Sequence, residues 1–254
     1  MKIRNIHVFL LIILTSCTKY DKSDIESLGI LKEIENFKEY TIEVTAENQL
    51  DTILIKTFIY NNKGKLIESE MKYNRIDSDY IAKYKYNSKN ELIQEIGKSN
   101  ETESPIIINY KRFNDTVINM SLEMKMESYD LVFRINGQEI YSTNNILQKI
   151  ITKEYYVNLG TKDTTINQIS EIYYKNGFVN KSIWKSYDSL VPNSNYEFIR
   201  NEKNLITKTI IYSNENKTET TFDYEFDDYG SWIKQNEYDD GKLIKIKSRR
   251  ITYK

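Results

Sequence analysis

The feature that most constrains the fold is an alternation of apolar and polar residues that begins near Tyr40 and continues along the chain. The segment VINMSLEMKMES shows it most clearly, because every second residue from Ile118 to Met126 is apolar and the residues between them are polar. Successive side chains of a strand point to opposite faces of a sheet, so the pattern predicts a strand with one buried and one solvated face. Methionine fills irregular gaps in a core, which favours packing over metal binding for this row.

Turn signals separate the alternating segments at short intervals. Asn136-Gly137 and Asn176-Gly177 are typical of two-residue hairpin turns, and Gly241 stands where a left-handed residue is favoured. The sequence therefore predicts an all-β fold, an antiparallel meander of hairpin repeats that forms a twisted open sheet or a partial barrel.

The meander is predicted to be a single domain over residues 25–254. Ser23 and Glu26 match a capping box, which allows one short helix at the start of this domain, bearing Ile25, Leu28, Leu31 and Ile34.

An internal repeat accompanies the turns. Its four copies are YNNKGKLI from Tyr60, YNSKNELI from Tyr86, IRNEKNLI from Ile199 and FDDYGSWI from Phe226. In each copy a large residue is followed six positions later by a leucine or tryptophan and then by an isoleucine. We expect the two large residues to form a cross-strand pair beside the turn.

These copies resemble the YD repeats of RHS-type surface proteins, most clearly over residues 50–95 and 195–254. They also resemble small exported lipoproteins of the Bacteroidota that carry a few degenerate hairpins of this kind. The resemblance implies a strand-turn-strand architecture. It does not extend to the toxin function of RHS proteins, whose shells need many more repeats than this chain contains.

The N-terminal residues predict export and a membrane tether. Lys2 and Arg4 precede an unbroken apolar run from Val8 to Leu14, which is the order of an export signal and is too short to span a bilayer, for which about 20 residues are needed. The following Leu-Thr-Ser-Cys resembles the lipobox of bacterial lipoproteins, which implies cleavage of residues 1–16 and acylation of Cys17. Residues 17–24 would then be a polar linker. The predicted membrane partner is a bilayer reached through acyl chains on Cys17, and the outer membrane is the expected location.

Composition excludes several kinds of chemistry from the mature chain. Removal of residues 1–16 removes the single histidine, and acylation of Cys17 removes the single thiol, so catalytic triads and the common zinc sites are not expected. The remaining 34 basic and 37 acidic side chains are interleaved, which argues against a nucleic-acid partner. No cofactor is predicted. The acidic pairs 227–228 and 239–240 could serve a glycan hydrolase or bind calcium, but both adjoin turn glycines, where aspartate is favoured for its own backbone hydrogen bonds.

Two aromatic rows are the candidate binding surface, and their residues are Tyr80, Tyr84, Tyr86, Tyr224, Phe226 and Trp232. Exposed rows of this kind bind sugars or peptides by stacking, whereas buried rows belong to a core, which the strand pattern favours. The C-terminal segment KLIKIKSRR is interpreted as a solvated edge strand protected by its lysines.

The function expected from these features is a non-catalytic binding or scaffolding role at the cell envelope, with an envelope protein or a glycan as partner. Two alternatives remain open at this point. One is an envelope hydrolase that works through carboxylates. The other is a carrier that holds an apolar ligand in a half-barrel.

Overall fold

The computed structural model describes residue 30 and residues 33–254, apart from residues 46, 76–77, 101–104, 127–130, 145, 177, 188–190 and 215. The predicted signal peptide, the linker and Cys17 lie outside the described residues, as do most positions of the predicted helix. Ile34, the last apolar residue of that helix pattern, is the first residue of a strand. Within the described part of the chain, no helix is long and apolar enough to cross a membrane.

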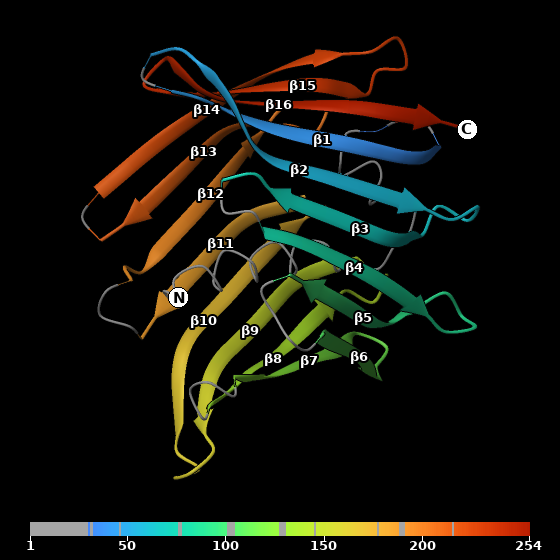
Figure 1. The fold of residues 1–254 in the computed structure, drawn as a ribbon, viewed down its shortest axis with the longest axis vertical. Coiled ribbons are helices and arrows are strands. Elements are labelled where there is room, and N and C mark those ends of the chain that lie inside the picture. Colours follow the sequence, from blue (N-terminus) through green and yellow to red (C-terminus); the bar gives the residue numbers. More distant parts are fainter. Residues whose placement is uncertain are drawn as a thin grey trace.

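The described residues form sixteen strands connected in sequence order by hairpins (Figure 1). The strands are β1 (Ile34–Val44), β2 (Leu50–Tyr60), β3 (Leu66–Tyr73), β4 (Ser78–Tyr86), β5 (Leu92–Ser99), β6 (Ile106–Asn114), β7 (Val117–Met126), β8 (Leu131–Tyr141), β9 (Leu147–Asn158), β10 (Thr164–Lys175), β11 (Phe178–Ser186), β12 (Ser194–Arg200), β13 (Ile206–Ser213), β14 (Asn216–Phe226), β15 (Trp232–Asp239) and β16 (Lys242–Tyr253).

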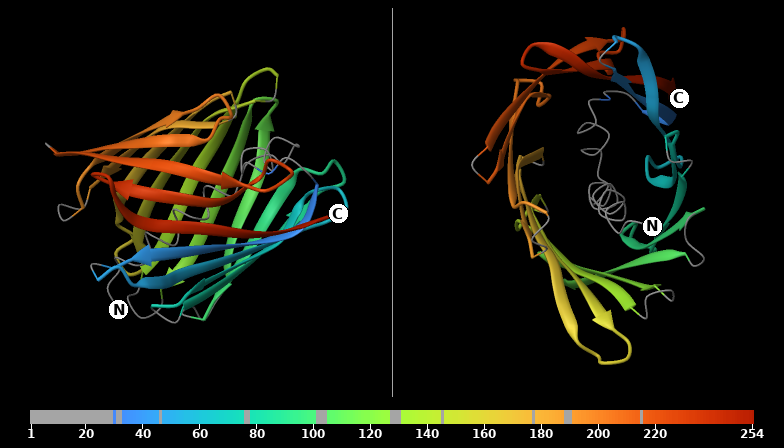
Figure 2. Two further views of the ribbon diagram at one scale, coloured as in Figure 1. Left: turned by 90° about the horizontal axis from the view of Figure 1, so that it is seen from above. Right: turned by 60° about the vertical axis from the view of Figure 1, so that its left-hand side comes forward.

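The sheet closes on itself into a barrel, because the first strand pairs with the last (Figure 2). β1 and β16 run antiparallel, with Phe37 opposite Ile251 and Glu43 opposite Lys245. The all-β antiparallel meander is as predicted, but the open sheet or partial barrel was wrong. Alternation within a strand shows which of its faces is buried, and it carries no information on whether strands about 210 residues apart will pair.

Closure also corrects the interpretation of the C-terminal segment. β16 pairs with β15 on one side and with β1 on the other, so it is an interior strand and not an edge. Its alternate residues Lys247 and Arg249 face Thr41 and Glu39 of β1 and point to the inside of the barrel. Arg249 is buried.

The four repeat copies form four copies of one turn. In each, an Asn or Asp accepts two backbone N–H bonds through its side-chain oxygen, and the fourth residue of the turn has a positive φ. The accepting residues are Asn61, Asn87, Asn201 and Asp227, and the positive-φ residues are Gly64, Asn90, Asn204 and Gly230. Asx side chains that bond their own backbone, followed by a residue tolerant of the left-handed region, explain why this sequence pattern recurs.

The predicted cross-strand pairs form in three of the copies. Tyr60 lies opposite Leu66, Tyr86 opposite Leu92, and Phe226 opposite Trp232.

The predicted start of the remaining copy, at Ile199, was wrong by one residue. There the pair is Arg200 with Ile206, because the turn begins at Asn201. With this correction, Asn201 lies 26 residues before Asp227, the same spacing that separates Asn61 from Asn87.

The hairpin signals had mixed outcomes. Asp240 and Gly241 both have positive φ in the turn between β15 and β16, as expected for a type I′ turn. Asn136-Gly137 is not a turn, because both residues lie within β8. A Cβ on Gly137 would lie 2.7 Å from Cγ of Met120, so this glycine allows close packing between β7 and β8. Gly177, of the third signal, lies outside the described residues.

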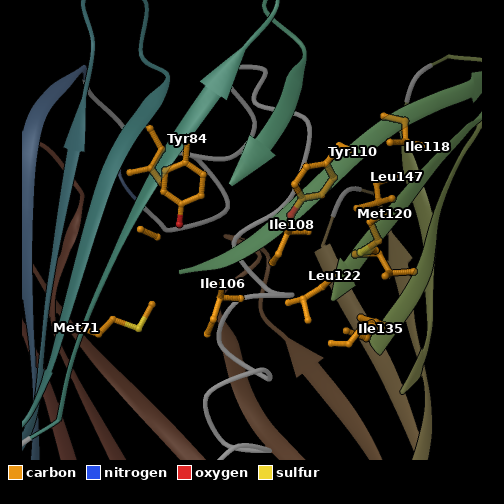
Figure 3. Packing of buried hydrophobic residues seen from close by; sticks show 14 of the residues in the cluster. Met71, Tyr84, Ile106, Ile108, Tyr110, Ile118, Met120, Leu122, Ile135 and Leu147 are labelled. Atoms are coloured by element: carbon orange, nitrogen blue, oxygen red, sulfur yellow. The ribbon is translucent and has the colours of Figure 1, made fainter. Parts of the chain in front are cut away.

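The buried faces of the strands point into the barrel and form one apolar cluster (Figure 3). On β7, Ile118, Met120 and Leu122 are buried while Ser121 and Glu123 are exposed, as the alternation predicted. The other large members of the cluster include Phe37, Tyr60, Leu66, Met71, Tyr80, Tyr84, Ile106, Ile108, Tyr110, Phe133, Ile135, Tyr141, Leu147, Ile150, Ile172 and Tyr174.

We predict that Asn201→Ala lowers the free energy of unfolding by about 1–2 kcal/mol, because two backbone N–H groups of the turn lose their acceptor. Denaturant unfolding followed by tryptophan fluorescence measures the loss. The matched control is Glu202→Ala at the next, exposed position, which should change stability by less than about 0.5 kcal/mol. Equal effects of the two substitutions would contradict the role of the Asn201 side chain.

Gly97→Ala should destabilise the barrel by about 1–3 kcal/mol, because the added Cβ would overlap the ring of Tyr80. The ring atom Cζ of Tyr80 lies 2.3 Å from the position of that Cβ, and Tyr80 is fully buried. Gly241→Asn is the control, since nothing lies within 4 Å of its Cβ position and asparagine tolerates its φ of +75°. A shift of the thermal midpoint for Gly97→Ala no larger than that of the control would refute the overlap.

Candidate functional site

The first aromatic row belongs to the barrel interior. Tyr80 and Tyr84 are buried on the inner face of β4, where their hydroxyls bond Glu95 at 3.4 Å and Ser69 at 3.0 Å. Tyr86 is half-buried and donates its hydroxyl to the carbonyl oxygen of Leu66 at 2.8 Å. The three residues share one face, as predicted, and that face is directed inward.

The second row lies elsewhere in the barrel, on β14 and the start of β15, so the structure does not bring the two rows together (Figure 1). Tyr224 packs its ring edge-on against Trp232, with centroids 5.8 Å apart, and lies 6.4 Å from Phe226. Trp232 is buried, Tyr224 is half-buried, and Phe226 is 39% exposed. The Tyr224 hydroxyl donates to the carbonyl of Ile206 and accepts from the side-chain amide of Gln235.

A row of charged residues crosses the strands where the barrel closes. Glu39 of β1 lies opposite Arg249 of β16 on one side and opposite Lys56 of β2 on the other. Arg249 Nε is 3.0 Å from Glu39 Oε2, and both side chains are almost fully withdrawn from solvent. Lys247 shares the inner face of β16 with Arg249 and lies opposite Thr41 and Gln235. We call Glu39, Lys56, Lys247 and Arg249 the seam cluster.

Aromatic rings hold the guanidinium of the seam cluster. Arg249 Cζ lies 3.3 Å from the ring centroid of Trp232 and 5.2 Å from that of Phe37. Arginine stacks well on aromatic faces and stays charged when buried. The second aromatic row and the seam cluster are therefore parts of one site, which we take as the candidate functional site.

The site carries more positive than negative charge. Three cations share one carboxylate, whereas the next lysine along β16, Lys245, has its own partner in Glu237 at 3.2 Å. Burial alone would raise the pKa of Glu39, but Arg249, Lys56 and Lys247 together lower it below its ordinary value. Burial lowers the pKa of Lys56, and Glu39 opposes this shift only in part. Both directions are those expected where cations outnumber anions away from water.

Sequence reasoning missed the seam cluster. The signal was present, because Lys245, Lys247 and Arg249 occur at every second position and so share one face of a strand. Deciding whether that face is inside or outside requires the pairing of β16 with β1, which the alternation does not show.

The acidic pairs do not face each other across a cleft. Asp227 accepts the N–H groups of Tyr229 and Ser231, which is the turn role expected of it, and also accepts the hydroxyl of Tyr253. Asp239 and Asp240 lie at the other end of β15. Among the residues that the structure describes, no group of three or more acidic, histidine or cysteine side chains could hold a metal ion.

Comparisons with solved structures include two distant matches. The chain matches no protein-family model, and no curated protein is similar to it. A porin-like protein from Bacteroides vulgatus has 10% sequence identity and a TM-score of 0.48, over 88% of this chain and 99% of that one. A porin-like protein from Bacteroides uniformis has 12% identity and a TM-score of 0.31, over 86% and 97%. At these values the likeness carries no information on function.

Arg249→Met should cost about 3–5 kcal/mol of stability at neutral pH, because it leaves the buried carboxylate of Glu39 without its bonded partner. The double variant Glu39→Gln/Arg249→Met should recover most of this loss. Urea unfolding of the single and double variants measures both values, and a double variant as unstable as Arg249→Met would contradict the pairing.

The same pair predicts a dependence on pH. The pKa of Glu39 is lower in the folded protein than its ordinary value of 4.5, so the ion pair contributes fully above pH 4.5 and its contribution is lost as the pH falls through the folded-state pKa. The stability difference between the wild type and Arg249→Met should therefore narrow in acid.

Proposed function

We propose that this protein is an exported lipoprotein, tethered to the outer membrane through Cys17, whose barrel binds an apolar or amphipathic ligand on its inner face without catalysing a reaction. The observation that carries the proposal is the polarity of the wall, because ion pairs cross its outer face, whereas its inner face is mainly apolar and aromatic apart from the seam cluster and buried polar side chains such as Glu95 and Glu154.

The outer face carries ion pairs between neighbouring strands. Examples are Arg134 with Glu123 at 2.7 Å, Lys149 with Glu171 at 2.9 Å and Lys234 with Glu225 at 2.6 Å, and two further pairs are Lys83–Glu68 and Lys208–Glu219. Within β14, Lys217 also pairs with Glu219. A membrane-spanning barrel has an apolar outer band, where one Lys or Arg at the midplane costs about 2–4 kcal/mol. The outer face also exposes Ile81, Ile199 and Tyr212, but its ion pairs favour contact with water, and in this proposal the membrane is reached through the acyl chains alone.

The inner face has a buried part and a half-exposed part. From β3 to β10 it consists mainly of buried aliphatic and tyrosine side chains. From β12 to β14, the inward aromatic residues Tyr196, Phe198, Phe222 and Tyr224 are only half-buried. Eight strands already give an interior that side chains fill, and larger barrels enclose ligand cavities or channels. A sixteen-strand barrel with apolar and aromatic residues inside is therefore of the size and lining suited to a ligand.

Closure narrows the binding modes. A partner cannot add a strand to a closed sheet, so scaffolding through a sheet edge has no basis in this barrel. The half-barrel form of the carrier hypothesis is corrected to a closed barrel. A hydrolase that uses the two acidic pairs is not favoured, because they lie at opposite ends of β15.

Cys17→Ala tests the tether and the polarity of the wall together. We expect the wild type to incorporate a clickable palmitate analogue and to fractionate with the outer membrane, whereas the variant should carry no label and leave the membrane fraction after a urea wash. An unlabelled variant that resists extraction and floats with the membranes would show that the barrel itself is inserted, and would overturn the proposal.

A further inference from the structure

We infer that the seam cluster binds the anionic head of an amphipathic ligand, either a carboxylate or a phosphate at the end of an acyl chain, whose apolar part lies along the inner face beside Phe58 and Tyr224. This inference rests on the proposed function and names the chemical class of its ligand.

The seam cluster contains three cations and one carboxylate. Lys56 lies on the inner face of β2, and Lys247 and Arg249 lie on that of β16; β1, between these two strands, contributes only Glu39 as a counter-charge. Neighbouring carboxylates are already committed, since Glu237 binds Lys245 and Glu43 binds Arg75. Removing a cation from water without a counter-charge is costly, so a surplus of cations at such a place is complemented by an anion.

Lys56 is the cation of the cluster that is placed to receive an anion. Its Cα partners across the sheet are Glu39 and Met71, which places its side chain inside the barrel. Glu39 is bonded to Arg249. Within the described part of the chain, the ammonium group of Lys56 makes neither a hydrogen bond nor an ion pair. Its side chain keeps part of its surface exposed. Lys56 is therefore both buried enough to favour an anion and open enough to receive one.

Aromatic rings surround the cations on both sides of the cluster. Phe37 stacks on Phe58 with centroids 4.6 Å apart, and both lie on the strands that carry Glu39 and Lys56. On the other side, Trp232 and Tyr224 form the aromatic wall beside Arg249. Phe37 and Trp232 are themselves buried, whereas Phe58 and Tyr224 keep part of their surface exposed. A small hydrated anion would gain nothing from this exposed ring surface, whereas an acyl chain attached to the anionic head would bury its apolar surface against it.

The test compares palmitic acid with 1-hexadecanol, which has the same chain and no charge. The full-length lipoprotein is purified from its host membrane in a mild detergent, and bound molecules are counted by native mass spectrometry at matched ligand concentrations. We expect the acid to bind at least about tenfold more tightly than the alcohol. Palmitoyl-oleoyl phosphatidic acid, added in a parallel series, distinguishes a phosphate head from a carboxylate head.

Three variants locate the binding. Lys56→Met should weaken palmitate binding about tenfold and leave hexadecanol binding unchanged, whereas Lys56→Arg should retain the preference for the acid. Lys38→Met is the matched control, because Lys38 lies on the outer face of β1 beside Glu39, and it should change neither affinity. Thermal unfolding verifies that each variant is folded.

The outcomes separate the two proposals. Equal binding of the acid, the phosphatidic acid and the alcohol, unchanged by Lys56→Met, would overturn the inference while supporting an apolar ligand in the barrel. No binding of any of the three would overturn the proposed function and the inference together. A preference for either anion that is lost in Lys56→Met and kept in Lys56→Arg supports the inference.

Discussion

The pairing of β1 with β16 is the contact on which the rest of the structure depends. All the other strand pairs are hairpins between strands that are consecutive in the sequence, whereas this pair joins the first strand to the last. Bringing such distant segments together costs chain entropy, so the pair needs contacts that adjacent hairpins can do without. The buried bond between Glu39 and Arg249 and the stack of Arg249 on Trp232 supply them across β1, β16 and β15.

Closure also turns a simple alternation into two different surfaces. Once β1 meets β16, each strand has one face inside and one outside, and each of the strands that the structure describes is paired with a neighbour on both sides. The outer residues then form ion pairs such as Arg134–Glu123, while Ile108, Met120 and Phe133 pack inside. The alternation in the sequence shows that the two faces of each strand differ in polarity, but only closure of the sheet determines which face lies inside the barrel.

Local features of the fold were predictable from the sequence, and long-range ones were not. The strand at Ile118–Met126 and the turns at Asn61 and Asp227 depend on residues within a few positions, so alternation and turn chemistry identify them. Asn136-Gly137 failed because the same dipeptide also suits close packing against Met120, which lies on another strand. The spacing of Tyr224 and Trp232 identified that row from the sequence. Glu39, Lys56 and Arg249, in contrast, form one cluster only because β1 and β2, near the start of the sequence, lie beside β16, near its end.

The seam cluster places two demands on the same residues. For closure alone, one cation opposite Glu39 would suffice, and an apolar residue at position 56 would pack against Phe58 and Met71 at lower cost than a lysine. Sequences are locally consistent where only folding is at stake, and departures concentrate where a function requires them. Lys56 is such a departure, because it adds a buried positive charge to a seam that Arg249 already closes. The proposed binding site and the contact that closes the barrel therefore lie on the same strands. An anion bound at Lys56 would also favour the closed barrel over any form in which β1 has separated from β16.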